Sequence, residues 1–578
     1  MKLLRVCVWV SMLSVFALSG TLAMTTQKAS EPSPMAIRLT DAAREAGITV
    51  LNVSGGTSKD YLLEVVGNGA AWFDYNNDGL IDLLIVNGST IEKLKRGGDQ
   101  MVTLYRNNGN GTFTDVTAES GLTKKGWGMG VCTADYDNDG FEDIYITAYG
   151  GNVLFHNNGD GTFADVTQRA RIGLSSWSTG CAFGDYDRDG FVDLYVANYV
   201  AADVNSTPKR GTSPFCQYLG MDVLCGPRGL RGAPDVLYHN NGDGSFSEVT
   251  QAARIHDPGY YGFGVIFGDL NEDGWPDIFV ANDSTPNFFF RNDRNGTFSE
   301  VGLEAGAALS GDGRPQACMG VDVADYNNDG HLGIFVTNFS QDTSTLYRSN
   351  GDGTFTDVTS LAGFGASQLY MGWGTGFVDL DNDGWPDVFV ANGHIYPEID
   401  QSGIGSTYLE RKQLYQNLGN SRFADITDKI GGGLLLQKSS RGVAFGDYDN
   451  DGDLDILIVN LNDRPTLLRN DGGNKNHWIT LRLVGTKSNR DAIGAWVRAQ
   501  VGDRIERAEV RSGGSYISQN DSRVHFGLGR QTEVKRLEIR WPSGLVETYE
   551  NVRADQFLLA TEGQGLRPLK APRAMPNH

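Results

Sequence analysis

Positive charge is scarce in this chain of 578 residues, which carries 49 lysines and arginines against 71 aspartates and glutamates. The formal net charge is −22. Proteins that bind nucleic acid present a basic face to the phosphate backbone, so we expect no nucleic-acid partner. The chain is otherwise globular in composition, with 40% hydrophobic residues, and it is long enough for two or more domains.

Long hydrophobic runs are also missing, apart from one near the N-terminus. Lys2 and Arg5 precede an apolar run over residues 6–18, and Thr21-Leu22-Ala23 follows it. This arrangement predicts a signal peptide over residues 1–23. The alternative is an uncleaved anchor, although the run is shorter than the about 20 apolar residues that span a membrane. We expect an exported protein, secreted or periplasmic, with no membrane insertion after signal cleavage.

Cysteine is rare, with six residues in the whole chain. Cys216 and Cys225 lie nine residues apart in a loop rich in proline and glycine. A disulfide between them is expected if the protein works in an oxidising compartment. Cys132, Cys181 and Cys318 each precede an acidic loop within an apolar segment. We expect these three to be buried as small hydrophobic side chains.

Seven copies of a nine-residue acidic sequence dominate the chain. Six copies read D-x-[DN]-x-D-G-x-x-D, and the fifth departs at its ninth position, which is Gly333. A glycine lies five residues before the first aspartate of every copy. The copies begin at Asp74, Asp135, Asp185, Asp269, Asp325, Asp379 and Asp447. Internal repetition of this kind predicts a repeat architecture.

A second module follows the acidic sequence in each repeat. Its first example, Leu104-Tyr-Arg-Asn-Asn-Gly-Asn-Gly-Thr-Phe-Thr-Asp-Val-Thr117, has apolar stretches on both sides of an Asn-Gly turn. Such turns are typical of β-hairpins, because these residues accept the positive φ that a tight turn requires. Short β-rich runs also flank the acidic sequence itself. Each repeat therefore predicts four strands.

Four strands repeated seven times predict either a β-propeller or a stacked solenoid. The last hairpin, which begins at Thr466, lacks its second strand, and residues 37–41 resemble that missing strand. If the N-terminal strand completes the last blade, the ring closes without exposed sheet edges. We therefore predict an all-β fold, with a seven-bladed β-propeller over residues 37–473, a small β-sandwich-like domain over 474–563 and a flexible tail over 564–578.

The acidic sequences have the chemistry of calcium loops. Carboxylate and amide oxygens at positions 1, 3, 5 and 9, with a glycine at position 6, are hard ligands around a small centre, whereas Mg²⁺ rarely occupies an all-protein cage. The alternative is a set of solvated turns without metal. We expect up to seven Ca²⁺ ions, with the fifth site in doubt because Gly333 replaces a ligand. The candidate ligands are Asp74, Asn76, Asp78 and Asp82; Asp135, Asp137, Asp139 and Asp143; Asp185, Asp187, Asp189 and Asp193; Asp269, Asn271, Asp273 and Asp277; Asp325, Asn327 and Asp329; Asp379, Asp381, Asp383 and Asp387; and Asp447, Asp449, Asp451 and Asp455.

The acidic loops and the sequences that precede them, such as Phe183-Gly-Asp185 and Phe445-Gly-Asp447, resemble the FG-GAP/VCBS repeats of integrin α-subunit propellers. Further along, Asn489-Arg-Asp-Ala-Ile-Gly494, Gly513-Gly-Ser-Tyr-Ile-Ser518 and Trp541-Pro-Ser-Gly544 resemble the ASPIC/UnbV domain. The two in this order resemble the cartilage acidic protein family and its bacterial relatives. The resemblance implies a secreted or periplasmic calcium-binding repeat protein.

Three insertions suggest where a partner binds. They occupy residues 88–103, 199–234 and 393–413, each after the second strand of a repeat. Because strand direction alternates, we expect all three on the face opposite the calcium loops, where repeat proteins often build a recognition surface. The same face should carry Trp127, Trp177, Tyr261, Trp373 and His394. Packing between blades and a stacking platform for a glycan or peptide are the two interpretations of these aromatic residues.

Two functions remain open from the sequence. The first is a calcium-dependent adhesion or scaffold protein that binds an extracellular or periplasmic protein or glycan. The second is a polysaccharide- or ester-acting enzyme that uses the insertion face. The sequence has no P-loop, H-E-x-x-H or nucleophile elbow, so we expect no catalytic residues and favour binding.

Overall fold

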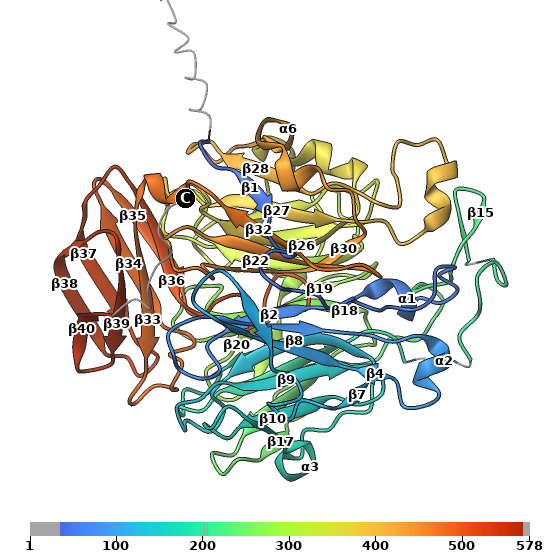
Figure 1. Cartoon of the computed structure of the whole chain (residues 1–578), viewed down its shortest axis with the longest axis horizontal. Helices are drawn as coiled ribbons and strands as arrows, with labels where there is room; N and C mark the ends of the chain where they lie inside the picture. The colour runs from blue at the N-terminus through green and yellow to red at the C-terminus, as the bar shows by residue number, and fades with distance from the viewer. Residues whose placement is uncertain (1–34, 202, 205, 215, 570–578) are drawn as a thin grey trace, which may run out of the picture. The chain divides into compact units, whose positions relative to one another are not determined.

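The computed structural model describes residues 35–201, 203–204, 206–214 and 216–569. The predicted signal peptide over residues 1–23 lies outside this range. The described residues from Met35 onward belong to one compact unit, and the all-β prediction is confirmed for them (Figure 1). Within these residues no helix is both long and apolar enough to cross a bilayer.

The repeats form seven four-stranded antiparallel sheets, numbered here in the order of their acidic loops. The strands are β2 (Ala70–Phe73), β3 (Asp82–Val86), β5 (Val102–Asn107) and β6 (Phe113–Asp115) in sheet 1; β8 (Gly128–Ala134), β9 (Asp143–Ala148), β10 (Val153–Asn157) and β11 (Phe163–Asp165) in sheet 2; β12 (Ser178–Gly184), β13 (Asp193–Asn198), β16 (Val236–Asn240) and β17 (Phe246–Glu248) in sheet 3; β18 (Gly262–Gly268), β19 (Asp277–Asn282), β20 (Phe288–Asn292) and β21 (Phe298–Glu300) in sheet 4.

Sheets 5 to 7 follow the same order. They contain β22 (Cys318–Ala324), β23 (Gly333–Asn338), β24 (Thr345–Ser349) and β25 (Phe355–Asp357); β26 (Gly372–Val378), β27 (Asp387–Asn392), β28 (Gln413–Asn417) and β29 (Phe423–Asp425); and β30 (Ser440–Gly446), β31 (Asp455–Asn460), β32 (Thr466–Asn470) and β1 (Leu39–Asp41). Each acidic sequence joins the first and second strands of its sheet, as predicted.

The first strand of each sheet contacts the first strand of the next, and β30 of sheet 7 contacts β2 of sheet 1. The glycine five residues before each acidic loop explains this close approach. A Cβ at Gly264 would lie 2.8 Å from the carbonyl oxygen of Met319, and a Cβ at Gly442 would lie 2.6 Å from that of Asn68. Because the second of these contacts joins the last sheet to the first, an open solenoid is excluded.

The N-terminal strand completes sheet 7. β1 pairs antiparallel with β32, with Leu39 opposite Asn470 and Asp41 opposite Leu468. The predicted exchange of a strand between the two ends of the repeat region is therefore confirmed. The main chain continues this pairing, because Arg38 and Asp471 exchange two hydrogen bonds of 3.1 and 2.8 Å.

Two disulfides are present. The predicted bond joins Cys216 and Cys225. The second bond joins Cys132 to Cys181, so these two are buried as expected but are disulfide partners rather than merely small hydrophobic side chains. They lie on β8 and β12, the adjacent first strands of sheets 2 and 3, which approach closely enough for a covalent link. Cys318 is a buried free cysteine, as expected.

The C-terminal domain has two four-stranded sheets. One contains β36 (Val524–Gly529), β33 (His477–Val484), β39 (Gln556–Thr561) and β40 (Gly565–Pro568), and the other contains β35 (Arg504–Glu509), β34 (Trp496–Val501), β37 (Glu533–Arg540) and β38 (Val546–Arg553). Side chains from both sheets share one buried core, including Ile479, Val497 and Leu537, which confirms two packed layers. β40 extends this domain into the segment predicted as a flexible tail, because it pairs with β39. Residues 570–578 lie outside the described residues.

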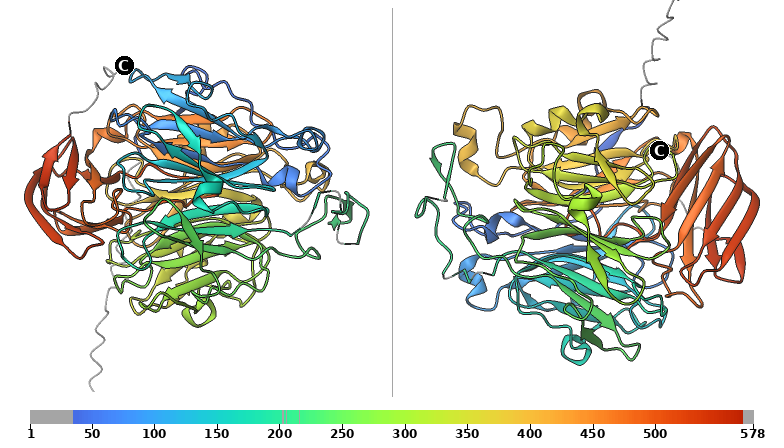
Figure 2. Two further views of the ribbon diagram at one scale, coloured as in Figure 1. Left: turned by 90° about the horizontal axis from the view of Figure 1, so that it is seen from below. Right: turned by 180° about the vertical axis from the view of Figure 1, so that it is seen from behind.

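The helices are single turns between strands. They are α1 (Leu63–Val66), α2 (Ile91–Leu94), α3 (Thr167–Ala170), α4 (Gly302–Ala305), α5 (Thr359–Ala362) and α6 (Thr427–Ile430), with 3₁₀ turns η1 (Phe364–Leu369), η2 (Pro397–Gln401), η3 (Gly432–Leu435) and η4 (Gly473–Lys475). Two short ribbons pair β4 (Asp99–Gln100) with β7 (Lys125–Gly126), and β14 (Gln217–Tyr218) with β15 (Met221–Asp222). The turns α1 and α2 and strand β15 lie at the opposite end of the molecule from the C-terminal domain (Figures 1 and 2).

Candidate functional site

The acidic loops share one backbone geometry. In the second loop, Asp135 accepts hydrogen bonds from the backbone N–H groups of Asp139 and Gly140 at 3.0 and 2.7 Å. The carboxylate at position 5, Asp139, accepts from the N–H of Phe141 at 2.9 Å. The same bonds from positions 5 and 6 to position 1 recur in loops 1, 3, 5, 6 and 7. The loops are therefore wrapped tightly around their own carboxylates.

In the six loops that have a ninth aspartate, this residue is the first of the second strand and is almost fully buried. Asp143 is 0% exposed, and it accepts a 2.8 Å hydrogen bond from the N–H of Asn157 at the end of the third strand. The equivalent bonds to Asp82, Asp193, Asp277, Asp387 and Asp455 come from Asn107, Asn240, Asn292, Asn417 and Asn470. This hairpin asparagine fixes the ninth carboxylate beside its loop.

The hairpin asparagines also connect neighbouring sheets. The side-chain amide of Asn157 donates to the backbone carbonyl of Tyr75, in the loop of sheet 1, at 2.8 Å. In sheet 1, Asn107 donates to Tyr448 in the loop of sheet 7 at 2.7 Å, which connects the first sheet to the last. Sequence reasoning missed these residues, although an asparagine in this place in six of the seven hairpins was the available signal.

Several loop carboxylate oxygens are buried without a hydrogen-bond partner. They include Oδ2 of Asp82 and Asp387 and Oδ1 of Asp137, Asp187, Asp269 and Asp449. Buried polar groups are normally satisfied, and a buried anionic oxygen without a donor is costly. Free lone pairs on crowded carboxylates match what an oxygen-binding cation requires. The residues present therefore fit the Ca²⁺ that the sequence predicts.

The electrostatics of the loops lead to the same conclusion. Burial, and then the neighbouring Asp193 carboxylate, raises the pKa of Asp185 to about 8. Burial, followed by the charge of Asp383, raises the pKa of Asp381 to about 7. A cation within these loops would compensate the charge that burial makes unfavourable.

Three carboxylate groups that could hold a metal lie in loops 2, 3 and 6. They are Asp135, Asp137 and Asp143; Asp185, Asp187 and Asp189; and Asp379, Asp381 and Asp383. These groups bring together predicted ligands from positions 1, 3, 5 and 9. Two further groups add His156 and His239 to the loop carboxylates.

The fifth loop is incomplete in two places. Gly333 stands where the ninth aspartate stands elsewhere, and Ser349 replaces the hairpin asparagine. The fifth sheet therefore lacks both the ninth aspartate and the hairpin asparagine that bonds to this aspartate in the other sheets. Asp325 still accepts from the N–H groups of Asp329 and Gly330, both at 3.0 Å, so the loop keeps its shape with fewer ligands.

The residues predicted for a partner surface are buried. Trp127 is 0%, Trp177 5%, Tyr261 9% and Trp373 2% exposed, and all four share one apolar cluster. His394 is also fully buried and contacts Ser340 at 3.1 Å. Packing between sheets accounts for these side chains as they stand, and of the five, Trp373 alone lines the cavity described next.

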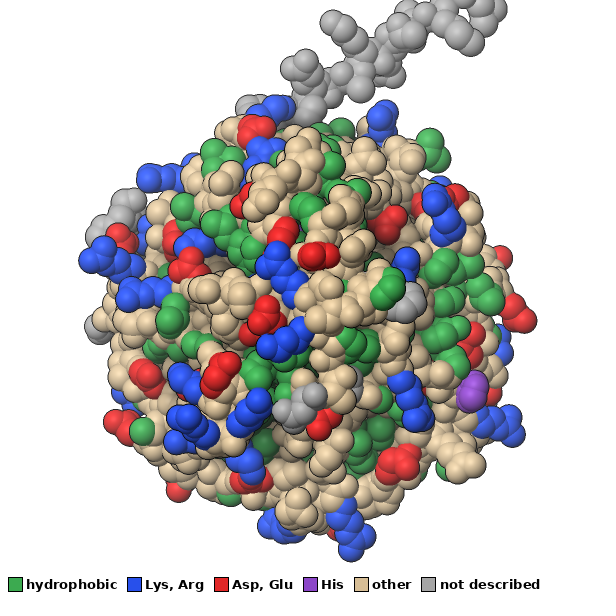
Figure 3. Space-filling model, turned by 90° about the vertical axis from the view of Figure 1, so that its right-hand side faces the viewer, with side chains coloured by type: hydrophobic (Ala, Val, Ile, Leu, Met, Phe, Trp, Pro, Cys, Tyr) green, Lys and Arg blue, Asp and Glu red, His purple; other side chains and the backbone are tan. Residues whose placement is uncertain are grey.

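A cavity of about 390 Å³ opens on the insertion face. Its lining includes Tyr199, Tyr218, Tyr396, Phe263 and Trp373, from the second and third insertions and from first strands. The single turns α1 and α2 lie at the same end of the molecule (Figure 1), and Figure 3 shows apolar side chains interspersed with basic and acidic ones on this face. The three insertions also share the buried cluster, through residues such as Ile91, Val204 and Ile395.

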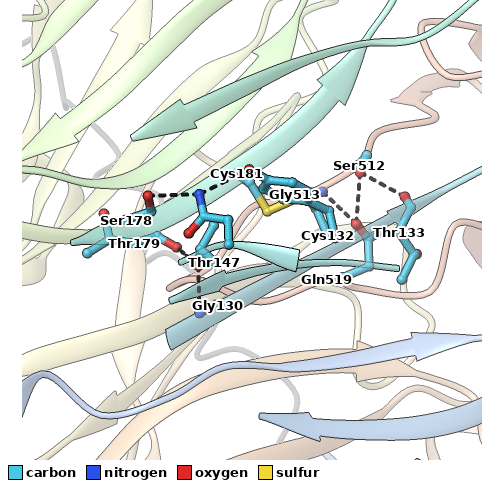
Figure 4. Close-up of a disulfide and its surroundings, with 12 residues drawn as sticks. Gly130, Cys132, Thr133, Thr147, Ser178, Thr179, Cys181, Ser512, Gly513 and Gln519 are labelled. Atoms are coloured by element: carbon cyan, nitrogen blue, oxygen red, sulfur yellow. Dashed lines mark hydrogen bonds between the residues drawn. A yellow bond between two sulfur atoms is a disulfide. The ribbon is translucent and has the colours of Figure 1, made fainter. Parts of the chain in front are cut away.

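A loop of the C-terminal domain fills the centre of the ring. We name residues 512–521, which connect β35 to β36, the channel loop. It bonds to first strands of six sheets, through Gln519, Ile517, Gly513, Ser515 and Asn520 among others. Next to the Cys132–Cys181 disulfide, Gln519 accepts from the N–H of Gly513 at 2.6 Å (Figure 4). Sequence reasoning identified this segment as a motif but missed its place.

The channel loop packs behind two residues that line the cavity. The Tyr516 ring lies 4.9 Å from the Trp373 ring and 5.4 Å from the Phe263 ring, measured between centroids. Its hydroxyl donates to the carbonyl of Val66 at 3.1 Å. Because Trp373 and Phe263 also line the cavity, the C-terminal domain supports the insertion face from inside the ring.

The same domain contacts the acidic loops. Arg482 bonds to Asp74 and Asn77 of loop 1, and Arg523 bonds to Asn450 and to the carbonyl of Asp447 in loop 7. It therefore covers the loop face of the ring and leaves the insertion face open.

Comparison with known proteins identifies both parts of the chain. The FG-GAP-like repeat family matches residues 74–146, 135–196, 221–280, 269–336, 333–390 and 404–458. The ASPIC and UnbV family matches residues 485–567. Cartilage acidic protein 1 of Mus musculus is 27% identical over 291 residues, which are 49% of this chain and 42% of the mouse protein. The Homo sapiens protein is 26% identical over 292 residues, 49% of this chain and 41% of its own. The chain thus matches less than half the length of these relatives.

Solved structures overlap with lower similarity. A complex of BBS1N with ARL6DN covers 74% of this chain and 96% of its own at a TM-score of 0.40 and 10% identity. An Agrocybe aegerita lectin that recognises non-reducing terminal N-acetylglucosamine covers 68% of this chain and 86% of its own, with a TM-score of 0.38 and 17% identity. The repeat matches alone span more than half of the sequence. The chain therefore belongs to the FG-GAP-like repeat family and carries a C-terminal ASPIC and UnbV domain.

Proposed function

We propose that this protein is an exported binding module that holds Ca²⁺ in its acidic loops and docks a protein or glycan on its insertion face. The observation that carries the proposal is the set of buried, unpartnered carboxylate oxygens in the loops. Up to seven ions are expected, with the fifth loop the weakest because it lacks the ninth carboxylate. When bound, Ca²⁺ would neutralise the crowded carboxylates and connect each loop to the start of the second strand.

An oxidising location fits the cysteines. Two disulfides, Cys132–Cys181 and Cys216–Cys225, account for four of the five cysteines in the described residues. Such bonds form and persist in secreted and periplasmic proteins and are rare in the reducing cytosol. We therefore propose a secreted or periplasmic location.

The insertion face has the features of a docking surface. Leu219, Ile404 and Leu409 lie in the second and third insertions and are 51%, 38% and 45% exposed. The same two insertions contribute Tyr199, Tyr218 and Tyr396 to the lining of the cavity. Aromatic walls and exposed apolar residues are typical of protein and glycan recognition.

Binding rather than catalysis fits the cavity. The buried carboxylate in its lining, Asp283, already accepts hydrogen bonds from the hydroxyls of Tyr199 at 2.6 Å and Ser284 at 2.8 Å. Each oxygen of this carboxylate is thus engaged by a neighbouring hydroxyl, which gives Asp283 a structural role in the wall of the cavity. We therefore propose no catalytic role for the site.

Ion stoichiometry tests the calcium proposal. Protein dialysed against Ca²⁺ and then against metal-free buffer should retain several ions by elemental analysis, and Asp82→Asn should remove one of them. Asp325→Asn, in the incomplete fifth loop, is the matched control and should change the count less. Retention of no Ca²⁺ by the folded protein would refute the proposal. A glycan array with and without Ca²⁺, followed by product analysis of any hit, tests the partner and separates binding from catalysis.

A further inference from the structure

The residue before each hairpin asparagine differs among the seven sheets. It is an arginine in four, Gln416 in sheet 6, and a histidine in sheets 2 and 3. The arginines are Arg106, Arg291, Arg348 and Arg469. Because this residue and the ninth aspartate lie on adjacent strands, its side chain can reach the acidic loop.

His156 lies among the carboxylates of loop 2. Its Nδ1 is 3.2 Å from Oδ1 of Asp143 and 3.4 Å from Oδ2 of Asp137, and its Nε2 is 4.0 Å from Oδ2 of Asp139. The side chain is 19% exposed, and Nδ1 is buried without a hydrogen bond of good geometry. The imidazole thus faces the position where a cation in the loop would lie.

His239 repeats this arrangement in loop 3. Its Nδ1 forms a 3.0 Å hydrogen bond with Oδ1 of Asp193, unlike Nδ1 of His156, and lies 3.5 Å from Oδ2 of Asp187. Asp193 is 0% exposed, like Asp143 in loop 2. Oδ1 of Asp187 has no hydrogen-bond partner, so an acceptor remains free beside the imidazole.

The four arginines form no ion pair with the carboxylates of their own loops among the described residues. Among the described residues, Arg291 pairs with Asp293 at 3.7 Å and Arg469 pairs with Asp471 at 2.9 Å. Both of these aspartates lie in the hairpins rather than in the acidic loops. No ion pair joins Arg106 or Arg348 to a loop carboxylate in the part of the chain that the structure describes. The two histidines therefore contact the loop carboxylates in a way that the arginines at the equivalent positions do not.

The spacing of the histidine and aspartate atoms suits a metal with mixed ligands. Two ligands bound to one tetrahedral Zn²⁺ at 2.0–2.2 Å lie about 3.3 Å apart, and the four shortest nitrogen–oxygen distances here run from 3.0 to 3.5 Å. Imidazole nitrogen is a ligand for Zn²⁺ and other transition metals, whereas Ca²⁺ takes oxygen ligands. Loops 2 and 3 also have a carboxylate at all four ligand positions.

We propose that loops 2 and 3 are transition-metal sites, in which His156 joins Asp137 and Asp143, and His239 joins Asp187 and Asp193. The oxygen-only loops keep Ca²⁺. This inference rests on the proposed function, because it assumes that the loops bind divalent cations. The competing account is that each imidazole acts as a fixed counter-charge and leaves no room for a metal ligand.

Titration with Zn²⁺ in the presence of saturating Ca²⁺ tests the proposal. Calorimetry should give two equivalents of Zn²⁺ for the full chain. His156→Gln and His239→Gln should each weaken one equivalent by at least about 10–100-fold, because loss of a mere outer-shell partner already has an effect of this size. Gln is the residue that sheet 6 already carries at this place, so the substitution preserves a natural side chain of the repeat.

Two controls distinguish these sites from non-specific binding of Zn²⁺ to other histidines. His477→Gln removes a histidine that pairs with Asp555 at 2.8 Å outside the loops, and it should leave both equivalents unchanged. Gln416→His places an imidazole beside a loop with four carboxylates and should add a third equivalent. Visible absorption of bound Co²⁺ gives a second readout, which should be lost in the double variant His156→Gln/His239→Gln.

The outcomes distinguish the two proposals. If the chain binds Ca²⁺ but the loop-histidine variants take up as much Zn²⁺ as the unaltered chain, the histidines are counter-charges and the transition-metal sites are refuted. Loss of Zn²⁺ in the His477→Gln control to the same extent would also refute them. If neither Ca²⁺ nor Zn²⁺ binds, the proposed function itself fails.

Discussion

On the loop face of the ring the same contacts recur in sheet after sheet, whereas the insertion face depends on three segments of unequal length. Position 1 accepts from positions 5 and 6, the ninth aspartate accepts from the hairpin asparagine, and the asparagine bonds to the preceding loop. The insertion face instead has single contacts, such as the ion pair of Arg210 with Glu398. The repeated contacts give the loop face many equivalent interactions. The three unequal insertions give the insertion face its irregular surface.

Removal of metal should have the largest effect and should act on the loop face. Without cations, burial and neighbouring carboxylates raise the pKa of Asp135 and of Asp185 to about 8. The folded metal-free state then binds more protons than the unfolded chain between about pH 4 and pH 8, so its free energy of unfolding falls as the pH rises across this interval. Saturating Ca²⁺ should remove this loss, because Ca²⁺ binds the deprotonated loops.

Thermal denaturation in EDTA and in Ca²⁺ from pH 5 to pH 8 measures this effect. The difference between the two melting temperatures should grow with pH and reach many degrees at pH 8. Hydrogen exchange at pH 8 should show lost protection in the acidic loops before the insertions. Equal melting temperatures at every pH would contradict the role of cations in stability.

The close approach of first strands should be the next most sensitive feature, since both faces depend on it. A Cβ at Gly180 would overlap the carbonyl oxygen of Phe263, so Gly180→Ala should lower the free energy of unfolding by about 3 kcal/mol. Gly151→Ala, where a Cβ meets nothing within 4 Å, should change it by less than about 0.5 kcal/mol. Equal values from urea denaturation would show that the sheets can move apart freely.

The asparagine series should have an intermediate effect on the loop face. Asn107→Ala leaves the buried carbonyls of Ile81 and Tyr448 without a donor, which should cost about 1–3 kcal/mol. Ser349→Ala at the same place in sheet 5 removes one hydrogen bond to Gly351 and should cost about 0.5 kcal/mol. If both substitutions lowered the free energy of unfolding equally in urea denaturation, the asparagine hydrogen bonds between loops would not contribute to stability.

The smallest effect is expected on the insertion face. Arg210 is 36% exposed in its ion pair with Glu398, and exposed pairs contribute little because solvent screens them. Arg210→Ala should therefore lower stability by less than about 1 kcal/mol, measured by the same denaturation. A larger loss than that of Asn107→Ala would reverse the comparison between the two faces.

Regular features were predictable from the sequence and contacts between repeats were not. The Asn-Gly hairpins, the acidic loops and the strand exchange of residues 37–41 follow from local patterns with a fixed period. Cys132 and Cys181 differ by one position relative to their glycines, Gly130 and Gly180. Their bond depends on how the first strand of one sheet is shifted relative to that of the next, and the sequence of a single repeat contains no information on this shift.

The burial of the residues predicted for the insertion face could not be predicted from local sequence patterns either. Trp127 lies three residues before its strand glycine and Trp373 one residue before its own. The first packs away from solvent against the first insertion, and the second lines the cavity above Tyr516. The position of the channel loop decides this difference, and that loop comes from a part of the chain about 140 residues later.

The position of the channel loop also implies an order in which the parts of the protein complete their folding. Its residues lie near the end of the chain, yet they bond to first strands throughout the ring. During synthesis from N- to C-terminus, the seven sheets precede the channel loop, and until it is made the apolar side chains that surround Trp373 lack their neighbour Tyr516. The centre of the ring is therefore completed only after all seven sheets have been made, and a chain truncated after the repeats would keep that interior accessible to proteases and chaperones.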